Sequence, residues 1–294
     1  VILLVVQLDF WCLLRNMFEL IIVKKWTKLI GNIMKEKIIK TKVGQLFVSY
    51  QPAEKIAVFL SGAGSLPTYE NFLPVIRKLP KNWGYLTIDY PNAGQSPLEN
   101  QKNVVLDDLV QSIIEVLSHF KVLQYAVCAH SISGLVAVKV AESEPFCQGL
   151  ILIEPTTYSV LYGELAQNPY PEFLSLQEKV QTLGGGYEYL KKIGQESFSA
   201  ADFKILWAKA ERSSDRLKSV QEGFQHYCSI AKSDFQNLDI SFQFPIFILS
   251  QAYREQEYKD SEFASQNAQI ILGSNHHYLH WSQSEKIVEF LLEM

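Results

Sequence analysis

The sequence predicts an α/β fold with a doubly wound, mostly parallel sheet of eight strands. Short, continuously apolar runs recur along the chain, and most of them are separated by segments with helical periodicity. Strands that are apolar on both faces are typical of a parallel sheet that helices cover on both sides. With 294 residues, 48% hydrophobic and 12% aromatic, the chain can build the large core that such a fold needs.

The first two strands are expected to form an antiparallel hairpin. The segments "KIIKTK" and "QLFVSY" alternate polar and apolar residues and are joined by Val43 and Gly44. Six apolar runs supply the remaining strands: "IAVFL" (56 to 60), "YLTID" (85 to 89), "YAVCA" (125 to 129), "LILIE" (150 to 154), "IFILS" (246 to 250) and "AQIIL" (268 to 272).

Helices are predicted between these strands from apolar residues that recur at helical spacing. They span Thr68 to Leu79, Val105 to Phe120, Ser133 to Glu142 and Ser282 to Leu292.

One interval breaks the alternation of strand and helix. Between Glu154 and Phe244 the chain carries helical patterns and no convincing core strand, and this interval is too long for a plain connection. We interpret it as a helical cap, residues 156–244, inserted between the sixth and seventh strands. The core would then comprise residues 34–155 and 245–294.

Charge and cysteine content limit the classes of function. A formal net charge of -4 provides no basic field to attract nucleic acid. The four cysteines, Cys12, Cys128, Cys147 and Cys228, lie far apart without a CxxC spacing, which indicates neither a zinc site nor a disulfide framework. A reducing, cytoplasmic location is therefore expected.

Residues 1–33 differ from the rest of the chain. They are strongly apolar but are interrupted by Asp9, Arg15 and Glu19, and they lack the charged start and small-residue cleavage site of a signal peptide. We interpret them as an extension outside the working domain. Membrane association through this segment is the alternative, which we do not favour.

The stretch "AVCAHSISGL" (126 to 135) contains the first candidate for chemistry. An apolar strand ends in His-Ser and is followed at once by small residues that open a helix. A sharp corner between strand and helix would raise the Ser131 hydroxyl, which is the geometry that a serine nucleophile needs. The alternative is a buried strand followed by a serine that caps the helix.

Three motifs, in this order along the chain, resemble those of the α/β-hydrolase family over residues 36–294. "FLSGAGS" (59 to 65) resembles the H-G-x-x turn, with Ser61 in place of histidine. "DYPNAGQS" (89 to 96) resembles the D-x-P-G-x-G-x-S loop. "CAHSISG" (128 to 134) resembles the nucleophile elbow G-x-S-x-G, with Ala129 and Ser133 in place of the glycines.

The resemblance implies roles for individual residues. Ser131 corresponds to the nucleophile, and the backbone N–H groups of Ile132 and Ala63 correspond to the oxyanion hole. A base is expected in the loop after the last strand, in "LGSNHHYLHWSQSEKIVEFL" (272 to 291). The family spacing favours His277 as that base, with His276 and His280 as alternatives.

The acid departs from the usual pattern. After "PIFILS" the family places an aspartate, but this chain has Arg254 there, with Glu255 beside it. Some members of the family take a glutamate from the end of the preceding strand, and Glu154 closes "LILIE" at that place. We therefore predict Glu154 as the acid, with Glu255 as the alternative.

The resemblance implies a serine hydrolase that cleaves an ester or related acyl bond of a small, largely apolar substrate through an acyl-enzyme. No cofactor and no metal are required. A carboxylesterase, an aminopeptidase, a thioesterase and an acyltransferase would share this plan of the active site. A small-molecule receptor with slow or no turnover on the same fold is the alternative from another class.

Overall fold

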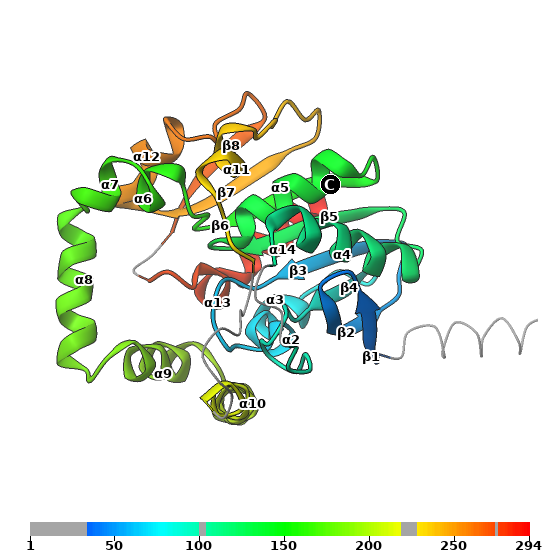
Figure 1. Ribbon diagram of the computed structural model, residues 1–294, viewed down its shortest axis with the longest axis horizontal. Coiled ribbons are helices and arrows are strands. Elements are labelled where there is room, and N and C mark those ends of the chain that lie inside the picture. Colours follow the sequence, from blue (N-terminus) through cyan, green and yellow to red (C-terminus); the bar gives the residue numbers. More distant parts are fainter. Residues whose placement is uncertain (1–33, 100–103, 219–227, 274–275) are drawn as a thin grey trace, which may run out of the picture.

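The computed structural model describes residues 34–99, 104–218, 228–273 and 276–294 (Figure 1). The predicted extension, residues 1–33, lies outside these ranges. No helix within them is both long enough and apolar enough to cross a membrane.

The predicted eight-stranded sheet is confirmed. Its spatial order is β1-β2-β4-β3-β5-β6-β7-β8. Strand β2 pairs antiparallel with both β1 and β4, and the other neighbouring strands run parallel. The strands are β1 (Lys35–Thr41), β2 (Gly44–Gln51), β3 (Lys55–Leu60), β4 (Trp83–Ile88), β5 (Tyr125–His130), β6 (Cys147–Ile153), β7 (Ile246–Gln251) and β8 (Ala268–Gly273).

Two of the predicted core helices are present almost as expected, α4 (Leu106–His119) and α5 (Ser133–Ser143). The single helix predicted from Thr68 to Leu79 is wrong, because it is divided into α2 (Thr68–Asn71) and α3 (Leu73–Ile76). Pro74 explains the division, since proline cannot donate to the preceding turn and is tolerated only in the first turn of a helix.

The last predicted helix also differs from the expectation. A short helix, α13 (Leu279–Ser282), precedes α14 (Ser284–Glu293), and Gln283 between them leaves the helical conformation with φ -123° and ψ 32°. The prediction that the last helix starts at Ser282 is therefore wrong, because Ser282 ends α13 and the last helix starts at Ser284.

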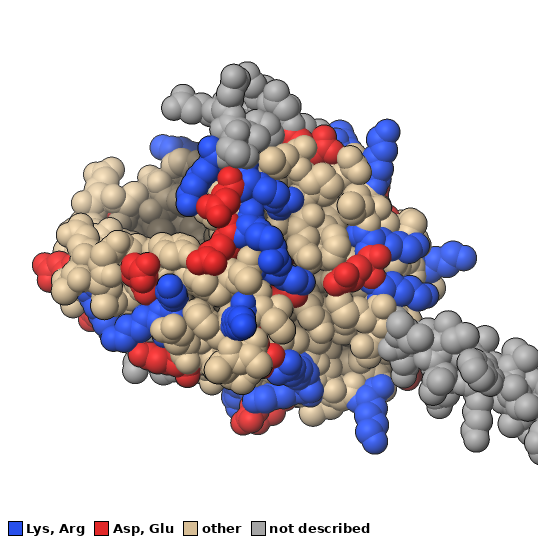
Figure 2. Space-filling view, turned by 90° about the horizontal axis from the view of Figure 1, so that it is seen from below, with Lys and Arg blue, Asp and Glu red and all other residues tan. Residues whose placement is uncertain are grey.

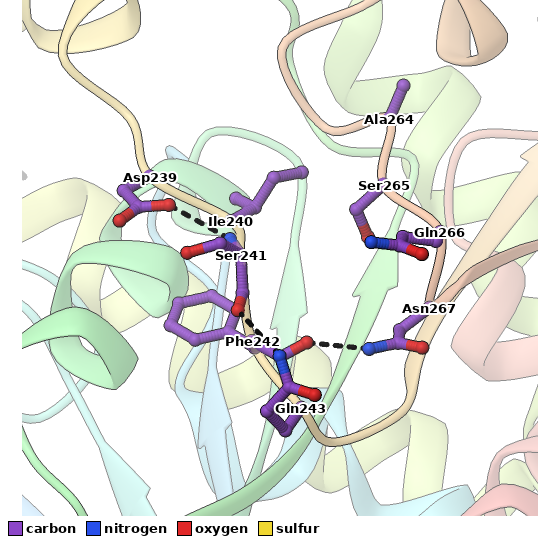
Figure 3. Close-up of a pocket in the computed structure, with 9 residues that line it drawn as sticks. All are labelled: Asp239, Ile240, Ser241, Phe242, Gln243, Ala264, Ser265, Gln266 and Asn267. Carbon is purple, nitrogen blue, oxygen red and sulfur yellow. Dashed lines mark hydrogen bonds between the residues drawn. The ribbon is translucent and has the colours of Figure 1, made fainter.

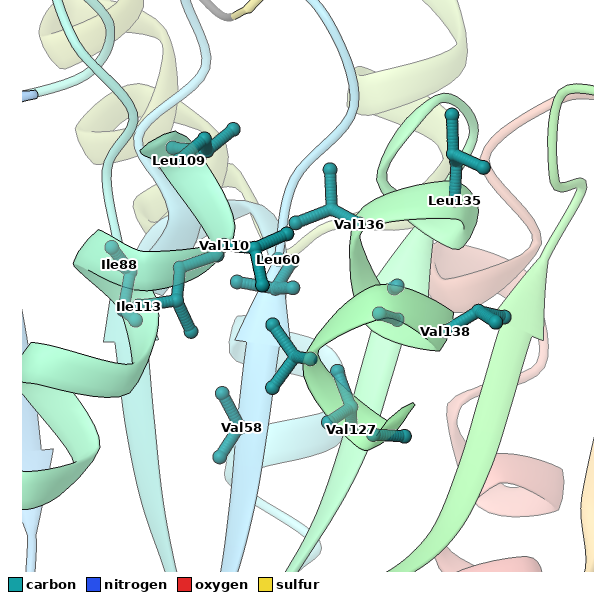
Figure 4. Packing of buried hydrophobic residues seen from close by; sticks show 14 of the residues in the cluster. Val58, Leu60, Ile88, Leu109, Val110, Ile113, Val127, Leu135, Val136 and Val138 are labelled. Atoms are coloured by element: carbon teal, nitrogen blue, oxygen red, sulfur yellow. The ribbon is translucent and has the colours of Figure 1, made fainter. Parts of the chain in front are cut away.

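Helices cover both faces of the sheet. On one face α4 and α5 pack against β3, β4 and β5 through buried aliphatic side chains (Figure 4). On the other face α3 and α14 pack through aromatic and aliphatic side chains against β3 and β7. Each buried side chain of this kind contributes about 1.5–3 kcal/mol, so both layers hold the sheet firmly. Examples are Leu109, Ile113, Leu135 and Val136 on the first face, and Phe72, Val75, Ile287 and Phe290 on the second.

The described residues between β6 and β7 contain six helices and no strand of the sheet. Figure 1 shows α8 and α9 at the periphery of the molecule, and no residue of α8 is buried. The limits of a separate cap at 156–244 stay a prediction. The helices are α6 (Tyr158–Leu161), α7 (Glu164–Gln167), α8 (Pro171–Thr182), α9 (Gly186–Ser197), α10 (Ala200–Lys218) and α11 (Lys232–Gln236).

Candidate active site

Ser131 lies at a sharp turn between β5 and α5. Its φ of 56° is a left-handed conformation that residues other than glycine rarely adopt. Two backbone hydrogen bonds hold the turn: Ser131 N–H donates to the Ile153 carbonyl at 2.8 Å, and Gly134 N–H donates to the Ser131 carbonyl at 2.9 Å. The turn places Ser131 in the lining of a cavity at the carboxyl ends of the parallel strands.

Two glycines make this turn possible. A Cβ atom on Gly134 would lie 2.6 Å from Cβ of Pro155, and a Cβ atom on Gly62 would lie 2.9 Å from Cβ of Ser131. Both distances are shorter than atoms tolerate, so these positions require glycine. The start of α5 therefore approaches Pro155 closely at Gly134, one residue after the buried Ser133 that replaces the glycine of the motif.

Glu154 follows β6 directly and turns its carboxylate into the same cavity. Its φ is 48°, its side chain is 1% exposed, and its Oε2 lies 3.5 Å from Nδ1 of His277. Gln251 donates its backbone N–H to Oε1 at 2.5 Å. Burial acts to raise the pKa of Glu154, but the contact with His277 and the charge of Arg254 outweigh it and lower this pKa to about 2. The carboxylate is therefore ionised at neutral pH.

His277 lies in the loop between β8 and α13 and also lines the cavity. Its side chain is 37% exposed, so the ring can reach a bound molecule. The backbone of this loop is anchored by His130, whose Nε2 lies 3.1 Å from the His277 carbonyl oxygen. Burial lowers the pKa of His130 well below its ordinary value, so its ring is neutral. His130 thus serves as a support for the loop.

The other two histidines of the loop have structural contacts. His280 is fully buried, with Nε2 3.1 Å from Asn71 Oδ1 and its ring stacked 4.4 Å from that of Phe72. Nδ1 of His276 accepts the backbone N–H of Tyr278 at 3.1 Å. Of the three candidates for the base, the structure brings His277 together with Ser131 and Glu154 in one cavity.

Arg254, which stands where the family has an aspartate, joins two buried carboxylates. Its Nη1 lies 2.8 Å from Oε2 of Glu154, and its Nε and Nη2 lie 2.9 Å and 2.6 Å from the two oxygens of Glu257. The sequence analysis missed this role, although a glutamate buried at a strand end requires a partner of opposite charge. Glu255 instead pairs with Lys259 at 2.6 Å and is 39% exposed, outside the lining of the cavity.

The two predicted oxyanion donors flank Ser131. Ile132 precedes α5, and Ala63 follows Gly62, which packs against the nucleophile turn. Within the described residues, no hydrogen bond engages the backbone N–H of Ile132 or of Ala63. Neither residue is among those that line the cavity, so their role as oxyanion donors stays a prediction. The Ser131 hydroxyl itself contacts Oγ1 of Thr156 at 3.3 Å.

The cavity has a volume of about 600 Å³ and two unlike walls. Its polar wall comes from the strand ends and carries Ser131, Glu154 and His277. Figure 2 shows a hollow on the lower face whose visible walls are mostly uncharged, while basic and acidic side chains are interspersed over the rest of that face. The apolar wall comes from α6, α7 and α8 and includes Val160, Leu161, Leu165, Phe173 and Leu176.

A second cavity lies beside the amino ends of β7 and β8, at the opposite edge of the sheet (Figure 3). The Asn267 side chain donates to the Phe242 carbonyl at 2.6 Å, and Asp239 accepts the N–H of Ser241 at 2.9 Å. These polar groups form hydrogen bonds with their neighbours in the lining, and the residues that line this cavity include no nucleophile paired with a base. The cavity with Ser131 is therefore the candidate site.

Among known proteins, solved structures match the chain, whereas no protein-family model and no curated protein does. The crystal structure of Smu.1393c from Streptococcus mutans is 34% identical, with 89% of this chain and 97% of that chain covered and a TM-score of 0.83. A thioesterase domain from the curacin biosynthetic pathway is 15% identical, with 89% and 100% covered and a TM-score of 0.61. The carboxylesterase CesB from Bacillus subtilis is 14% identical, with 92% and 94% covered and a TM-score of 0.60.

Proposed function

Because the chain belongs to the α/β-hydrolase fold family, we propose that it is a serine hydrolase that cleaves an ester or related acyl bond. One observation carries the proposal: Ser131, at its strained turn, shares a cavity with a histidine that contacts a buried, ionised glutamate. A nucleophile, a base and an orienting acid are the three groups that acyl transfer by serine requires.

In the proposed mechanism His277 accepts the proton of Ser131 as its Oγ attacks the acyl carbon. Glu154 accepts the Nδ1–H of His277 and stabilises the imidazolium that forms. The negative charge that develops on the acyl oxygen is bound by the N–H groups of Ala63 and Ile132. His277 then protonates the leaving group, and a water molecule, deprotonated by the same ring, hydrolyses the acyl-enzyme.

The proposed substrate is small and largely apolar. The helical wall of the cavity offers aliphatic and aromatic side chains, and Arg254 is already paired with two glutamates. A neutral acyl group suits such a lining, because a charged one would lose its hydration without gaining a partner. Carboxylesterase, thioesterase, aminopeptidase and acyltransferase chemistry all fit the same three groups. We also assign residues 34–155 and 245–294 to the catalytic core and residues 156–244 to the cap.

A small-molecule receptor is the second candidate. The observation that favours it is that α8, which borders the cavity, has no buried residue. Few packing contacts would therefore oppose a shift of this helix on ligand binding. Such a protein would bind an apolar molecule and turn it over slowly or not at all.

Labelling and turnover together test the proposal. A fluorophosphonate probe should label Ser131, and p-nitrophenyl esters of graded acyl length should be hydrolysed with many turnovers per molecule. Ser131→Ala should abolish both signals and leave the fold unchanged, since the hydroxyl contributes to chemistry more than to packing. Ser143→Ala, at the exposed end of α5, is the matched control and should retain both.

Two outcomes would contradict the hydrolase. Undiminished turnover by Ser131→Ala would exclude Ser131 as the nucleophile. Saturable binding of the esters, without product release beyond a single turnover, would favour the receptor.

A further inference from the structure

Ser133 occupies the position at which the family's elbow motif has glycine, and its hydroxyl is fully buried. Its Oγ lies 2.5 Å from the Ser61 carbonyl oxygen and 2.7 Å from the Tyr90 hydroxyl. A carbonyl oxygen can only accept, so Ser133 O–H donates to Ser61. The Tyr90 hydroxyl must then donate to Ser133. The result is a chain of hydrogen bonds with one direction, from Tyr90 through Ser133 to Ser61.

Ser61 is held from its other side as well. Its side-chain oxygen lies 2.9 Å from Nδ2 of Asn71. The orientation of the Asn71 amide follows from Trp281, because an indole N–H can only donate and lies 2.9 Å from Asn71 Oδ1. His280 contacts the same oxygen at 3.1 Å. Asn71 of α2 and Ser133 of α5 thus both bond to Ser61, and α13 holds Asn71 in place. Ser61 is the first residue of the loop that carries Ala63.

Beyond Gly62, which packs against the nucleophile turn, this loop has little support of its own. Gly64 has φ 129°, and a Cβ atom placed on it would meet nothing within 4 Å. Ala63 is exposed. The peptide unit that contains the Ser61 carbonyl is directly followed by the peptide unit that contains the Ala63 N–H. The direction of this N–H therefore depends on how firmly the Ser61 carbonyl is held.

We propose that Ser133, supported by Tyr90, is a positioning residue that directs the Ala63 N–H toward the oxyanion. The proposal rests on the hydrolase function above. Glycine at position 133 would leave the Tyr90 hydroxyl and the Ser61 carbonyl buried without this partner, which is unfavourable for both groups. Loss of a complete oxyanion donor costs about 100- to 1,000-fold in kcat, so loss of its alignment should cost less.

The first measurement compares two buried serines. Ser133→Ala should lower kcat by about tenfold to 100-fold and leave KM within about twofold, because the loop acts on the charge that develops in the transition state. Ser112→Ala is the matched control, since Ser112 is also fully buried and donates to a backbone carbonyl, that of Asp108, far from the site. It should lower the free energy of unfolding and leave kcat unchanged.

The second measurement separates alignment from a general loss of structure. With an alkyl trifluoromethyl ketone, Ser131 Oγ adds to the carbonyl carbon, its proton passes to His277, and the carbonyl oxygen becomes an oxyanion. Ser133→Ala should weaken inhibition by this ketone by the same factor as kcat/KM. Inhibition by the corresponding secondary alcohol, which forms no adduct, should not change.

Three results would overturn the proposal. If the wild-type protein hydrolyses esters and Ser133→Ala keeps both kcat and ketone inhibition within about twofold, the positioning role is wrong and the hydrolase function stands. Equal weakening of ketone and alcohol indicates a general structural effect. If the wild-type protein neither hydrolyses esters nor forms the ketone adduct, the hydrolase function fails and this proposal with it.

Tyr90→Phe provides a variant that retains the Ser133 to Ser61 hydrogen bond. It should show the same pattern with a smaller loss, about threefold to tenfold in kcat. Should Ser133→Ala not fold, this variant decides the proposal by the same comparison of ketone and alcohol.

Discussion

Helices α5 and α8 are similar in length, and α5 begins two residues after Ser131 of the cavity that α8 lines, but the two helices differ in how they are held. Leu135 and Val136 of α5 are at most 1% exposed, whereas Phe173 and Leu174 of α8 are 42% and 46% exposed. The candidate nucleophile precedes α5, and α8 provides part of the apolar wall. The candidate nucleophile thus sits at the start of the firmly packed helix, and part of the apolar wall sits on the loosely packed one.

This difference has a physical reason. Acyl transfer requires its groups to be held within a fraction of an ångström, and buried apolar side chains provide that rigidity. A helix without buried residues is held by few interactions, so it can change position or sequence at little cost in free energy. Changes near α5 should therefore affect rate and stability, and changes on α8 should affect the choice of substrate.

The largest effect is expected from the base. His277→Ala should lower kcat by about 10⁴-fold, because, among the residues that the structure describes, His277 is the histidine that both lines the Ser131 cavity and contacts Glu154. His280→Ala should instead lower the free energy of unfolding, since His280 packs on Phe72 and bonds Asn71. Ester hydrolysis and thermal unfolding of both variants check this, and a larger loss of kcat in His280→Ala would identify His280 as the base.

The packed region should also determine how stability depends on pH. Burial lowers the pKa of His130 and of His280 well below 6.5, so both rings stay neutral in the folded chain and take up a proton on unfolding. The stability that this provides is complete above the ordinary pKa of 6.5 and is lost as the pH falls below it. At pH 5 the loss is at most about 2 kcal/mol for each ring.

Asp89 opposes this trend in part, because burial raises its pKa to about 6 and it gains a proton in the folded chain as the pH falls. Denaturant unfolding at pH 7.5 and pH 5 measures the net change, which should be a decrease toward pH 5. A free energy of unfolding that is flat or rises toward pH 5 would contradict the prediction.

A smaller effect is expected from the acid. Glu154→Gln should lower kcat/KM at least tenfold more than Glu255→Gln does, which corresponds to about 1.4 kcal/mol of transition-state stabilisation. Glu154 contacts His277, whereas Glu255 forms an exposed ion pair with Lys259. Steady-state kinetics of the two variants at pH 7.5 provide the measurement. Greater damage from Glu255→Gln would place the acid after β7.

The smallest effect on the free energy of unfolding is expected from substitutions on α8. Phe173→Ala should change the ratio of kcat/KM for long and short acyl esters several-fold, while the free energy of unfolding changes by less than about 0.5 kcal/mol. Leu135→Ala on α5 is the contrasting variant and should cost about 2–5 kcal/mol. If Phe173→Ala is as destabilising as Leu135→Ala, α8 is part of the packed core after all.

Continuous apolar runs predicted six of the eight strands, and alternation of polar and apolar residues predicted β1 and β2; apolar residues at helical spacing predicted two of the core helices. Burial leaves a local, periodic signal in each case. It failed at Pro74 and Gln283, where a single residue breaks a helix within a pattern that remains periodic. Motif spacing also placed Ser131 and His277 among the candidates.

The contacts among the candidate residues were decided by the tertiary structure alone. The bond from Arg254 to Glu154 and the chain from Tyr90 through Ser133 to Ser61 join residues that are far apart in the sequence. Such contacts depend on which strand ends lie side by side and on which way each turn faces. The periodicity of a sequence cannot predict these contacts, because it indicates only which positions are buried. A hydrogen bond also requires a particular distance and direction between two groups.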